Sequence, residues 1–258
     1  MPTETTTAVI EFRDVSYGVG CTPVLSNLNL HINRGETLVL LGRSGSGKTS
    51  TLKLINRLLI PSSGEIRVNG ISNAQMDVIR LRRAIGYVFQ EAGLFPHFTV
   101  ERNIALVPRM ERWPAHRIHA RVQELLRLVE LTPEFASRYP HQLSGGQRQR
   151  VGVARALAAD PEILLMDEPF GALDPLTRDE LQREFHLLQQ GLQKTVIFVT
   201  HDLREALRLA SRIALMEAGK LVTVLSPQEF LKSSDPLASA YVRAFADGQA
   251  PSTQRGTS

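Results

Sequence analysis

The stretch that decides the fold is Gly42-Arg43-Ser44-Gly45-Ser46-Gly47-Lys48-Thr49. The run Thr37–Leu41 directly before it is continuously apolar, which is typical of a strand covered on both faces. The segment Thr49–Leu59 after it predicts a helix that ends before Pro61. Glycines between a strand and a helix let successive backbone N–H groups point into one concavity. The stretch therefore predicts a phosphate-binding loop in an α/β fold.

The loop also carries the charged and hydroxyl groups that a bound nucleotide needs. A helix N-terminus places positive partial charge where phosphate lies. Lys48 supplies a point charge to the β- and γ-phosphates, and the Thr49 hydroxyl can coordinate Mg²⁺. The predicted nucleotide-binding residues of this loop are Gly42, Arg43, Ser44, Gly45, Ser46, Gly47, Lys48, Thr49 and Ser50. The loop alone does not separate kinases, GTPases and ATPases.

Acidic residues end a second apolar run, Ile163–Met166, which is followed by Asp167 and Glu168. The carboxyl ends of parallel strands meet at one edge of a sheet, so we expect these acids near the phosphate loop. Asp167 would hold Mg²⁺, and Glu168 would accept a proton from the attacking water. A third strand, Val196–Thr200, ends at His201, which we expect to reach the γ-phosphate or the water.

The composition is that of an ordinary globular chain. It has 258 residues, of which 43% are hydrophobic, and a formal charge of +4 from 30 basic and 26 acidic residues. This small excess gives no support for nucleic-acid binding. The single cysteine, Cys21, cannot form an internal disulfide, which fits a reducing cytosol. No run approaches the roughly 20 apolar residues of a membrane span, so other chains would supply any membrane part.

Strand signals alternate with turns in the first part of the chain, fade between residues 91 and 160, and then return. We therefore expect an α/β core of residues 1–90 and 161–245 with a helical insertion of residues 91–160. A hairpin is expected around Ala218-Gly219-Lys220, and closing helices at Pro227–Leu231 and Leu237–Phe245. Residues 246–258 carry few apolar groups and are predicted to be a disordered tail.

A second glycine-containing helix start lies about a hundred residues after the first, at Leu143-Ser144-Gly145-Gly146-Gln147. Ser144 suits an N-terminal cap, and the glycines expose backbone N–H groups. Two such helix starts suggest one nucleotide held from two sides. The LSGGQ motif resembles the signature of ATP-binding cassette (ABC) transporter ATPases, and this resemblance covers Val9 to about Phe245.

The resemblance implies roles for further residues. Tyr17 is similar to the aromatic residue that stacks on adenine, and Gln90 to the glutamine that contacts the metal and the reacting phosphate. Ala172-Leu173-Asp174 resembles the loop that communicates between protomers, and His201 the switch histidine. The implied catalytic set is Lys48, Gln90, Glu168 and His201, the metal ligands are Thr49, Gln90 and Asp167, and Ser144, Gly145, Gly146, Gln147 and Asp174 also contact nucleotide.

The family also implies an architecture and an assembly. Its fold is a P-loop core with a mainly parallel sheet, an antiparallel β subdomain at the N-terminus and an inserted α-helical subdomain. Two copies close head to tail around two MgATP, with Gly42–Thr49 of one facing Ser144–Gln147 of the other. Residues 90–108 would contact membrane permease subunits at the cytoplasmic face of the cell membrane, and a substrate-binding protein would act only indirectly.

Three segments resemble the subfamily that imports glycine betaine, choline and related osmoprotectants: Gly42–Leu59, Gly93–Pro108 and Arg138–Pro169. Ser50 departs mildly from the threonine often found there. The short segment after residue 245 leaves no room for the regulatory modules of the cystathionine-β-synthase type that many relatives carry, so we expect no such regulation. An importer of another small solute, such as an amino acid or polyamine, stays open.

Three other classes of protein fit the sequence less well than an importer ATPase. Cassette ATPases that act on DNA or ribosomes usually carry two cassettes or long coiled coils, which one chain of this length without heptads does not fit. An exporter ATPase is disfavoured by the resemblance of Gly93–Pro108 to importers. A small-molecule kinase with a phosphate loop has no need of LSGGQ.

Overall fold

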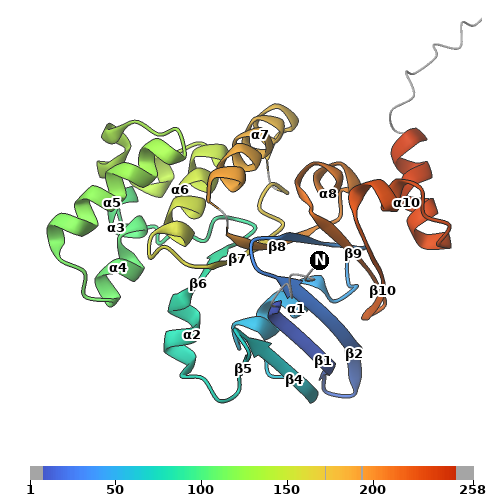
Figure 1. The fold of residues 1–258 in the computed structure, drawn as a ribbon. Coiled ribbons are helices and arrows are strands. Elements are labelled where there is room, and N and C mark those ends of the chain that lie inside the picture. The colour runs from blue at the N-terminus through green and yellow to red at the C-terminus, as the bar shows by residue number, and fades with distance from the viewer. Residues whose placement is uncertain (1–7, 172, 193, 248–258) are drawn as a thin grey trace, which may run out of the picture.

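A six-stranded sheet forms the centre of the molecule in the computed structural model, which describes residues 8–171, 173–192 and 194–247 (Figure 1). Its strands, in spatial order, are β10 (Lys220–Leu225), β9 (Arg212–Glu217), β3 (Thr37–Leu41), β8 (Thr195–Thr200), β7 (Ile163–Asp167) and β6 (Ile85–Val88). Neighbouring strands are parallel except for the hairpin β9–β10. Every residue of β3 and β8 is buried, as expected for strands covered on both faces.

A second, antiparallel sheet is built mainly from the N-terminal part of the chain. Its strands, in spatial order, are β2 (Thr22–Asn33), β1 (Ala8–Val19), β4 (Ser63–Val68) and β5 (Ile71–Ser72). In β2, Leu28, Leu30 and Ile32 are buried and the residues between them are exposed, so the period of two holds. β1 is longer than the expected strand at Val9–Phe12, because its polar residues continue the pairing with β2.

Helix α1 (Lys48–Ile55) follows the phosphate loop and contacts strands of both sheets, namely β2 and β4 on one side and β7 and β8 on the other. Its buried residues Leu52, Leu54 and Ile55 join the apolar core that the two sheets share. The helix ends before the expected Leu59, because Arg57 has a positive φ of 55° and the Asn56 side chain accepts a hydrogen bond from the N–H of Leu58 at 3.2 Å.

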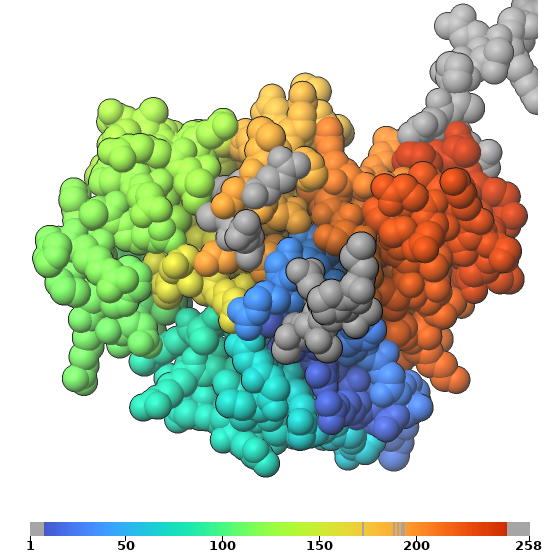
Figure 2. Space-filling model, in the orientation of Figure 1, coloured from blue at the N-terminus to red at the C-terminus, as the bar shows by residue number. Residues whose placement is uncertain are grey.

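Between β6 and β7 the chain forms helices, which make one lobe of the molecule, coloured green to yellow in Figure 2. They are α3 (Val100–Ile104), α4 (Leu106–Met110), α5 (Ala115–Leu128), the 3₁₀ turns η1 (Pro133–Ser137) and η2 (Pro140–Gln142), and α6 (Gly145–Leu157). In α5, Ile118, Val122 and Leu125 recur at helical spacing and are buried. The predicted division of the chain into core and insertion stays a prediction.

The other helices connect or flank the strands. They are α2 (Val78–Ala84), α7 (Pro175–Leu192), α8 (Leu203–Leu209), α9 (Pro227–Leu231) and α10 (Pro236–Asp247). α10 runs two residues into the segment predicted as a tail, and residues 248–258 lie outside the described part of the chain. Among the helices that the structure describes, none combines the length and the apolar character that a membrane crossing requires.

Candidate functional site: a phosphate loop beside two acidic residues and a histidine

The phosphate loop joins β3 to α1 at the carboxyl edge of the central sheet. Gly45 and Gly47 have φ of 81° and 96°, values that glycine adopts without strain. Gly47 also packs closely, since a Cβ there would lie 2.5 Å from Leu25 Cδ2. The backbone conformation and the packing together explain why the last loop position before α1 is glycine.

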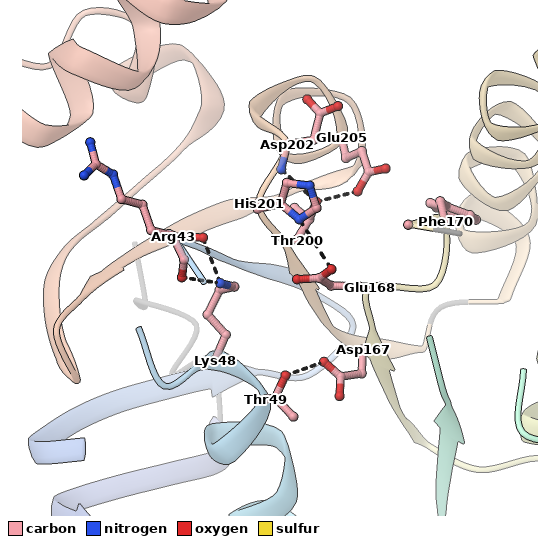
Figure 3. Close-up of polar contacts among 12 residues, drawn as sticks. Arg43, Lys48, Thr49, Asp167, Glu168, Phe170, Thr200, His201, Asp202 and Glu205 are labelled. Carbon is pink, nitrogen blue, oxygen red and sulfur yellow. Dashed lines mark hydrogen bonds and ion pairs between the residues drawn. The ribbon is translucent and has the colours of Figure 1, made fainter. Parts of the chain in front are cut away.

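Lys48 is 5% exposed and lies inside the loop that precedes it. Its Nζ donates to the carbonyl oxygen of Gly42 at 2.7 Å and to that of Arg43 at 2.8 Å (Figure 3). Burial lowers the pKa of Lys48, and the charges of Glu168 and Asp167 oppose that shift. The loop thus holds an ammonium group next to the two carboxylates.

Asp167 ends β7 and faces α1, as the parallel-sheet argument predicts. Thr49 Oγ1 donates a hydrogen bond to Asp167 Oδ1 at 2.7 Å, across 118 positions of sequence. The hydroxyl of Tyr87 donates to Asp167 Oδ2 at 3.3 Å. Burial raises the pKa of Tyr87 above its ordinary value, and the nearby Asp167 charge adds to the shift, so this hydroxyl stays a neutral donor. Asp167 and Thr49 therefore present oxygen atoms on one side of the loop.

Glu168 follows Asp167 in a backbone conformation that is uncommon for a non-glycine residue, with φ of 43°. Its N–H donates to the carbonyl of Val199 at 3.1 Å, which fixes the strand end. One carboxylate oxygen, Oε2, lies 3.4 Å from His201 Nδ1. A strained backbone at a strand end that carries a carboxylate is a feature of functional sites.

A hollow of about 580 Å³ opens beside this cluster and is lined by Arg43, Ser44, Glu168 and His201. Its other wall is the face of α10 that carries Leu237, Ala240, Tyr241 and Ala244. The sequence identifies α10 as a closing helix but has no signal that places it here. No sequence motif lies in α10, so only the folded structure reveals that this helix forms a wall of the hollow.

The second helix start is capped as expected. The N–H of Gln147 donates to Ser144 Oγ at 3.2 Å, and the N–H of Ser144 donates to Gln147 Oε1 at 3.0 Å. Gly146 packs against α7, because a Cβ there would lie 2.6 Å from the Thr177 methyl carbon. Gly145 lines a different hollow, of about 260 Å³, together with Gln90. Within the described residues of one chain, the two helix starts therefore face separate hollows.

Gln90 and Glu168 approach each other although they line different hollows. A Cβ built on Gly171 would lie 3.6 Å from Glu168 Oε2 and 3.7 Å from Gln90 Nε2, so both polar groups border Gly171. Gln90 itself is exposed just after β6. The structure thus places Gln90 and the carboxylate of Glu168 around the same glycine.

The remaining predicted residues lie as follows. Asp174 precedes α7 and accepts a hydrogen bond from the N–H of Thr177 at 3.1 Å. Hydrogen bonding with the Thr177 side chain, and then with its N–H, lowers the pKa of the Asp174 carboxyl group. Tyr17 lies in β1 and packs partly against the core shared by the sheets. Ser50 is half-buried in α1. Ala172 lies outside the described residues.

A loop of this form at the start of a helix, with acids at the end of the adjacent strand, defines a nucleotide-binding protein of the P-loop class. The chain belongs to the ABC transporter family, because the sequence model of that family matches residues 25–171.

Two relatives bear on the kind of transporter. The choline transport ATP-binding protein OpuBA of Bacillus subtilis (strain 168) is 53% identical over 214 residues, which make up 83% of this chain and 56% of that protein. The glycine betaine uptake system ATP-binding protein YehX of Escherichia coli (strain K12) is 50% identical over 237 residues, 92% of this chain and 76% of that protein. This chain spans about half the length of the Bacillus relative.

The fold is also that of solved ABC cassettes. A dimeric ATP-binding cassette in a post-hydrolysis state, bound to ADP and Pi, superposes with a TM-score of 0.76 at 34% sequence identity. The match covers 84% of this chain and 98% of that structure. It bears out the predicted fold class: a central, mainly parallel sheet with an antiparallel N-terminal sheet and helices.

Proposed function

We propose that this chain is the ATP-binding and ATP-hydrolysing subunit of an importer. The solute that we propose is an osmoprotectant such as glycine betaine or another quaternary amine, as the names of the relatives suggest. The observation that carries the proposal is the joint arrangement at the sheet edge. An ammonium group, a hydroxyl–carboxylate pair and a carboxylate–imidazole pair converge there from three separate strand ends.

Each of these groups has a task in ATP hydrolysis. Lys48 binds the β- and γ-phosphates once they displace its contacts with Gly42 and Arg43, and the rest of the loop from Gly42 to Ser50 donates N–H groups to phosphate. Glu168 accepts a proton from the attacking water, and His201, 3.4 Å away, orients that water or the γ-phosphate. Tyr17 stacks on adenine.

The oxygen atoms beside the loop fit a magnesium ion. Thr49 Oγ1 and the Asp167 carboxylate are hard oxygen donors, which Mg²⁺ prefers, and with Gln90 they form the proposed ligand set. Bound Mg²⁺ would neutralise charge on the phosphates. Thr49 and Asp167 already contact each other in the structure, so little rearrangement is needed to present both.

A second copy of the chain would complete the nucleotide site. Gly145, in the helix start Ser144–Gln147, lines a different hollow from the phosphate loop of its own chain. In a head-to-tail dimer this helix start faces the loop of the partner, and Asp174 lies at the contact between the copies. ATP then favours the closed dimer because it binds that state more tightly.

The surface at residues 90–108 would bind the permease at the cytoplasmic face of the membrane. Phe89 and Phe95 are 42% and 41% exposed, and both line a hollow of about 230 Å³ with Leu106 and Val107. Exposed apolar side chains around a hollow suit a protein partner. Leu94, which the sequence places in the same surface, instead packs partly against the core.

The organisation that supports this function is a core of residues 1–90 and 161–245 with a helical subdomain of residues 91–160. In this arrangement Gln90 connects the site to the proposed permease surface, since it directly follows Phe89. Movement of the helical subdomain would carry Ser144–Gln147 toward or away from the partner copy. A substrate-binding protein would act through the permease and not touch this chain.

Phosphate release from ATP tests the proposal. We expect Glu168→Gln to keep ATP binding while kcat falls at least about a hundredfold, the scale of general-base catalysis. Lys48→Ala should weaken ATP binding itself. The matched control is Glu124→Gln, since the Glu124 side chain is 60% exposed on α5, a helix that lies away from α1 in Figure 1. ATP turnover by Glu168→Gln at the wild-type rate would show that Glu168 is not the general base.

Uptake measurements test the solute. Cells that lack the gene should lose uptake of labelled glycine betaine or choline, and the chain should restore it. If the cells lose amino-acid or polyamine uptake instead, the chain is still an importer subunit, but its solute is not an osmoprotectant. Unchanged uptake of all of these, with export of a solute lost, would reject an importer.

A further inference from the structure

A buried carboxylate, Glu205, lies directly behind His201. Glu205 is 5% exposed and belongs to the first turn of α8. The hydroxyl of Thr200, the residue before His201, donates to Glu205 Oε2 at 2.5 Å (Figure 3). The same hydroxyl oxygen accepts a hydrogen bond from the N–H of Asp202 at 3.0 Å. One hydroxyl, held by Glu205, thus anchors the chain on both sides of His201.

The other oxygen of Glu205 reaches a different part of the site. Gln182 on α7 donates from Nε2 to Glu205 Oε1 at 2.9 Å. Arg208 holds Gln182 in place, since its Nη1 donates to Gln182 Oε1 at 3.3 Å and to Asp179 Oδ1 at 2.7 Å. Glu205 therefore joins the strand end that carries His201 to the helix that follows the Asp174 loop.

Helix α7 in turn holds the loop after Glu168. Arg178 donates to the carbonyl oxygens of Phe170 at 3.2 Å and of Leu173 at 2.9 Å. Its charge also acts on Glu205, where it opposes the rise in pKa that burial causes. The contacts around Glu205 thus extend from Thr200 to the backbone between Glu168 and Asp174.

His201 itself has little packing to fix its direction. Its side chain is 63% exposed, and its ion-pair distance to Glu168 is 3.4 Å. An exposed imidazole at a strand end takes its direction from the backbone that carries it. That backbone is fixed by the Thr200 hydroxyl, which Glu205 orients.

Keeping a charged group at this buried position is costly for stability. Burial raises the pKa of Glu205, the charge of Asp202 adds to the shift, and the Thr200 hydrogen bond, Arg178 and His201 oppose it. A buried carboxylate does not by itself indicate a stabilising role, because a protein with an apolar or neutral group of the same shape at that position is often as stable. Its role in holding Thr200 offers a reason for a carboxylate here.

We propose that Glu205 is a positioning residue for ATP hydrolysis, which holds His201 through Thr200 and links it through Gln182 to the loop after Glu168. The inference rests on the proposed ATPase function. Glu205 is buried and acts through its neighbours Thr200 and Gln182.

The test compares two threonines of the same buried strand, β8. Thr200→Val removes the hydroxyl that Glu205 holds. Thr195→Val is the matched control, because Thr195 is also buried and its hydroxyl accepts a hydrogen bond from Gly35 N–H at 2.9 Å, at the opposite end of the strand. Thr200→Ser restores the hydroxyl, and Glu205→Gln keeps the shape of the side chain without its charge.

We expect Thr200→Val to lower kcat by about tenfold to a hundredfold, the cost of a misplaced catalytic group. KM for ATP should stay within about twofold, because the Thr200–Glu205 contact is proposed to act in the transition state and not in ATP binding. Thr200→Ser should regain most of kcat, and Glu205→Gln should lose kcat while its Tm changes little. Thr195→Val should lose thermal stability but keep kcat per folded molecule.

Three results would overturn the inference: wild-type kcat in Thr200→Val, equal kcat losses in Thr200→Val and Thr195→Val, or no recovery in Thr200→Ser. The proposed function fails in a different way. In that case the wild-type chain would not hydrolyse ATP at all, whereas wild-type turnover by His201→Ala would leave the ATPase function standing and overturn only the positioning role of Glu205.

Discussion

The hydrogen bond from Thr49 Oγ1 to Asp167 Oδ1 joins the phosphate loop to the acidic strand end, and Thr49→Val removes it. Valine has nearly the shape of threonine but cannot donate or accept a hydrogen bond. The contact is 2.7 Å long between two half-buried side chains, and Tyr87 still donates to the other Asp167 oxygen. The substitution therefore changes one hydrogen bond and, when nucleotide is bound, one proposed metal ligand.

The expected loss of stability is small. A hydrogen bond to a charged group contributes about 1.5–3 kcal/mol when buried, so a half-buried one with a second donor should contribute about 1 kcal/mol. For a chain of this size that corresponds to a fall in Tm of about 3 °C. The measurement is thermal unfolding without nucleotide, with Thr49→Ser as a control that keeps the hydroxyl.

The expected effect on activity is larger. If the lost Mg²⁺ ligand is worth about 1.4 kcal/mol, half-maximal ATP hydrolysis needs about tenfold more Mg²⁺. The assay is a titration of Mg²⁺ at fixed ATP with phosphate release as the readout. Thr49→Ser should need the wild-type Mg²⁺ concentration. A Thr49→Val chain with the wild-type Mg²⁺ requirement would refute the assignment of Thr49 as a ligand.

Three further substitutions probe the loop, the surface and the response to acid. Gly47→Ala should cost about 1–2 kcal/mol for the left-handed backbone alone, and more because its Cβ would meet Leu25 at 2.5 Å; urea unfolding checks this. Phe95→Asp should abolish co-purification with the permease while nucleotide binding persists, because it places a charge on the exposed apolar surface. The Lys194 contact at 2.7 Å lowers the pKa of Asp160 in the folded chain. The folded pKa is thus below the unfolded value of about 3.9, so Asp160 stabilises the fold above that pH and loses this effect as pH falls through the folded pKa. Wild type should therefore be more stable than Asp160→Asn at pH 7, and the difference in urea midpoint should disappear in strong acid.

The sequence predicts well the features that depend on local pattern. The run Thr37–Leu41 is a strand with the expected ends, and the expected strand Val196–Thr200 begins one residue earlier, because a buried strand shows as a largely apolar segment. The approach of Asp167 to Thr49 also follows from sequence, since parallel strands bring their carboxyl ends to one edge. The catalytic and metal-binding roles of these residues stay predictions.

Features that depend on distant packing were not predictable from the sequence. Glu205 has the pattern of an ordinary acid in the first turn of a helix, where such residues are common. Only the fold places Gln182 and Thr200 on either side of its carboxylate. In the same way, Tyr241 is an unremarked residue of a closing helix until α10 is seen to line the hollow beside Arg43.

The most direct test of the account is the mass of Glu168→Gln in solution, measured by sedimentation with and without MgATP. Without nucleotide the variant should sediment as one chain of 28.7 kDa, and saturating ATP should double that mass. A variant that binds ATP but keeps the mass of a single chain, even with its permease present, would contradict a nucleotide site shared by two copies.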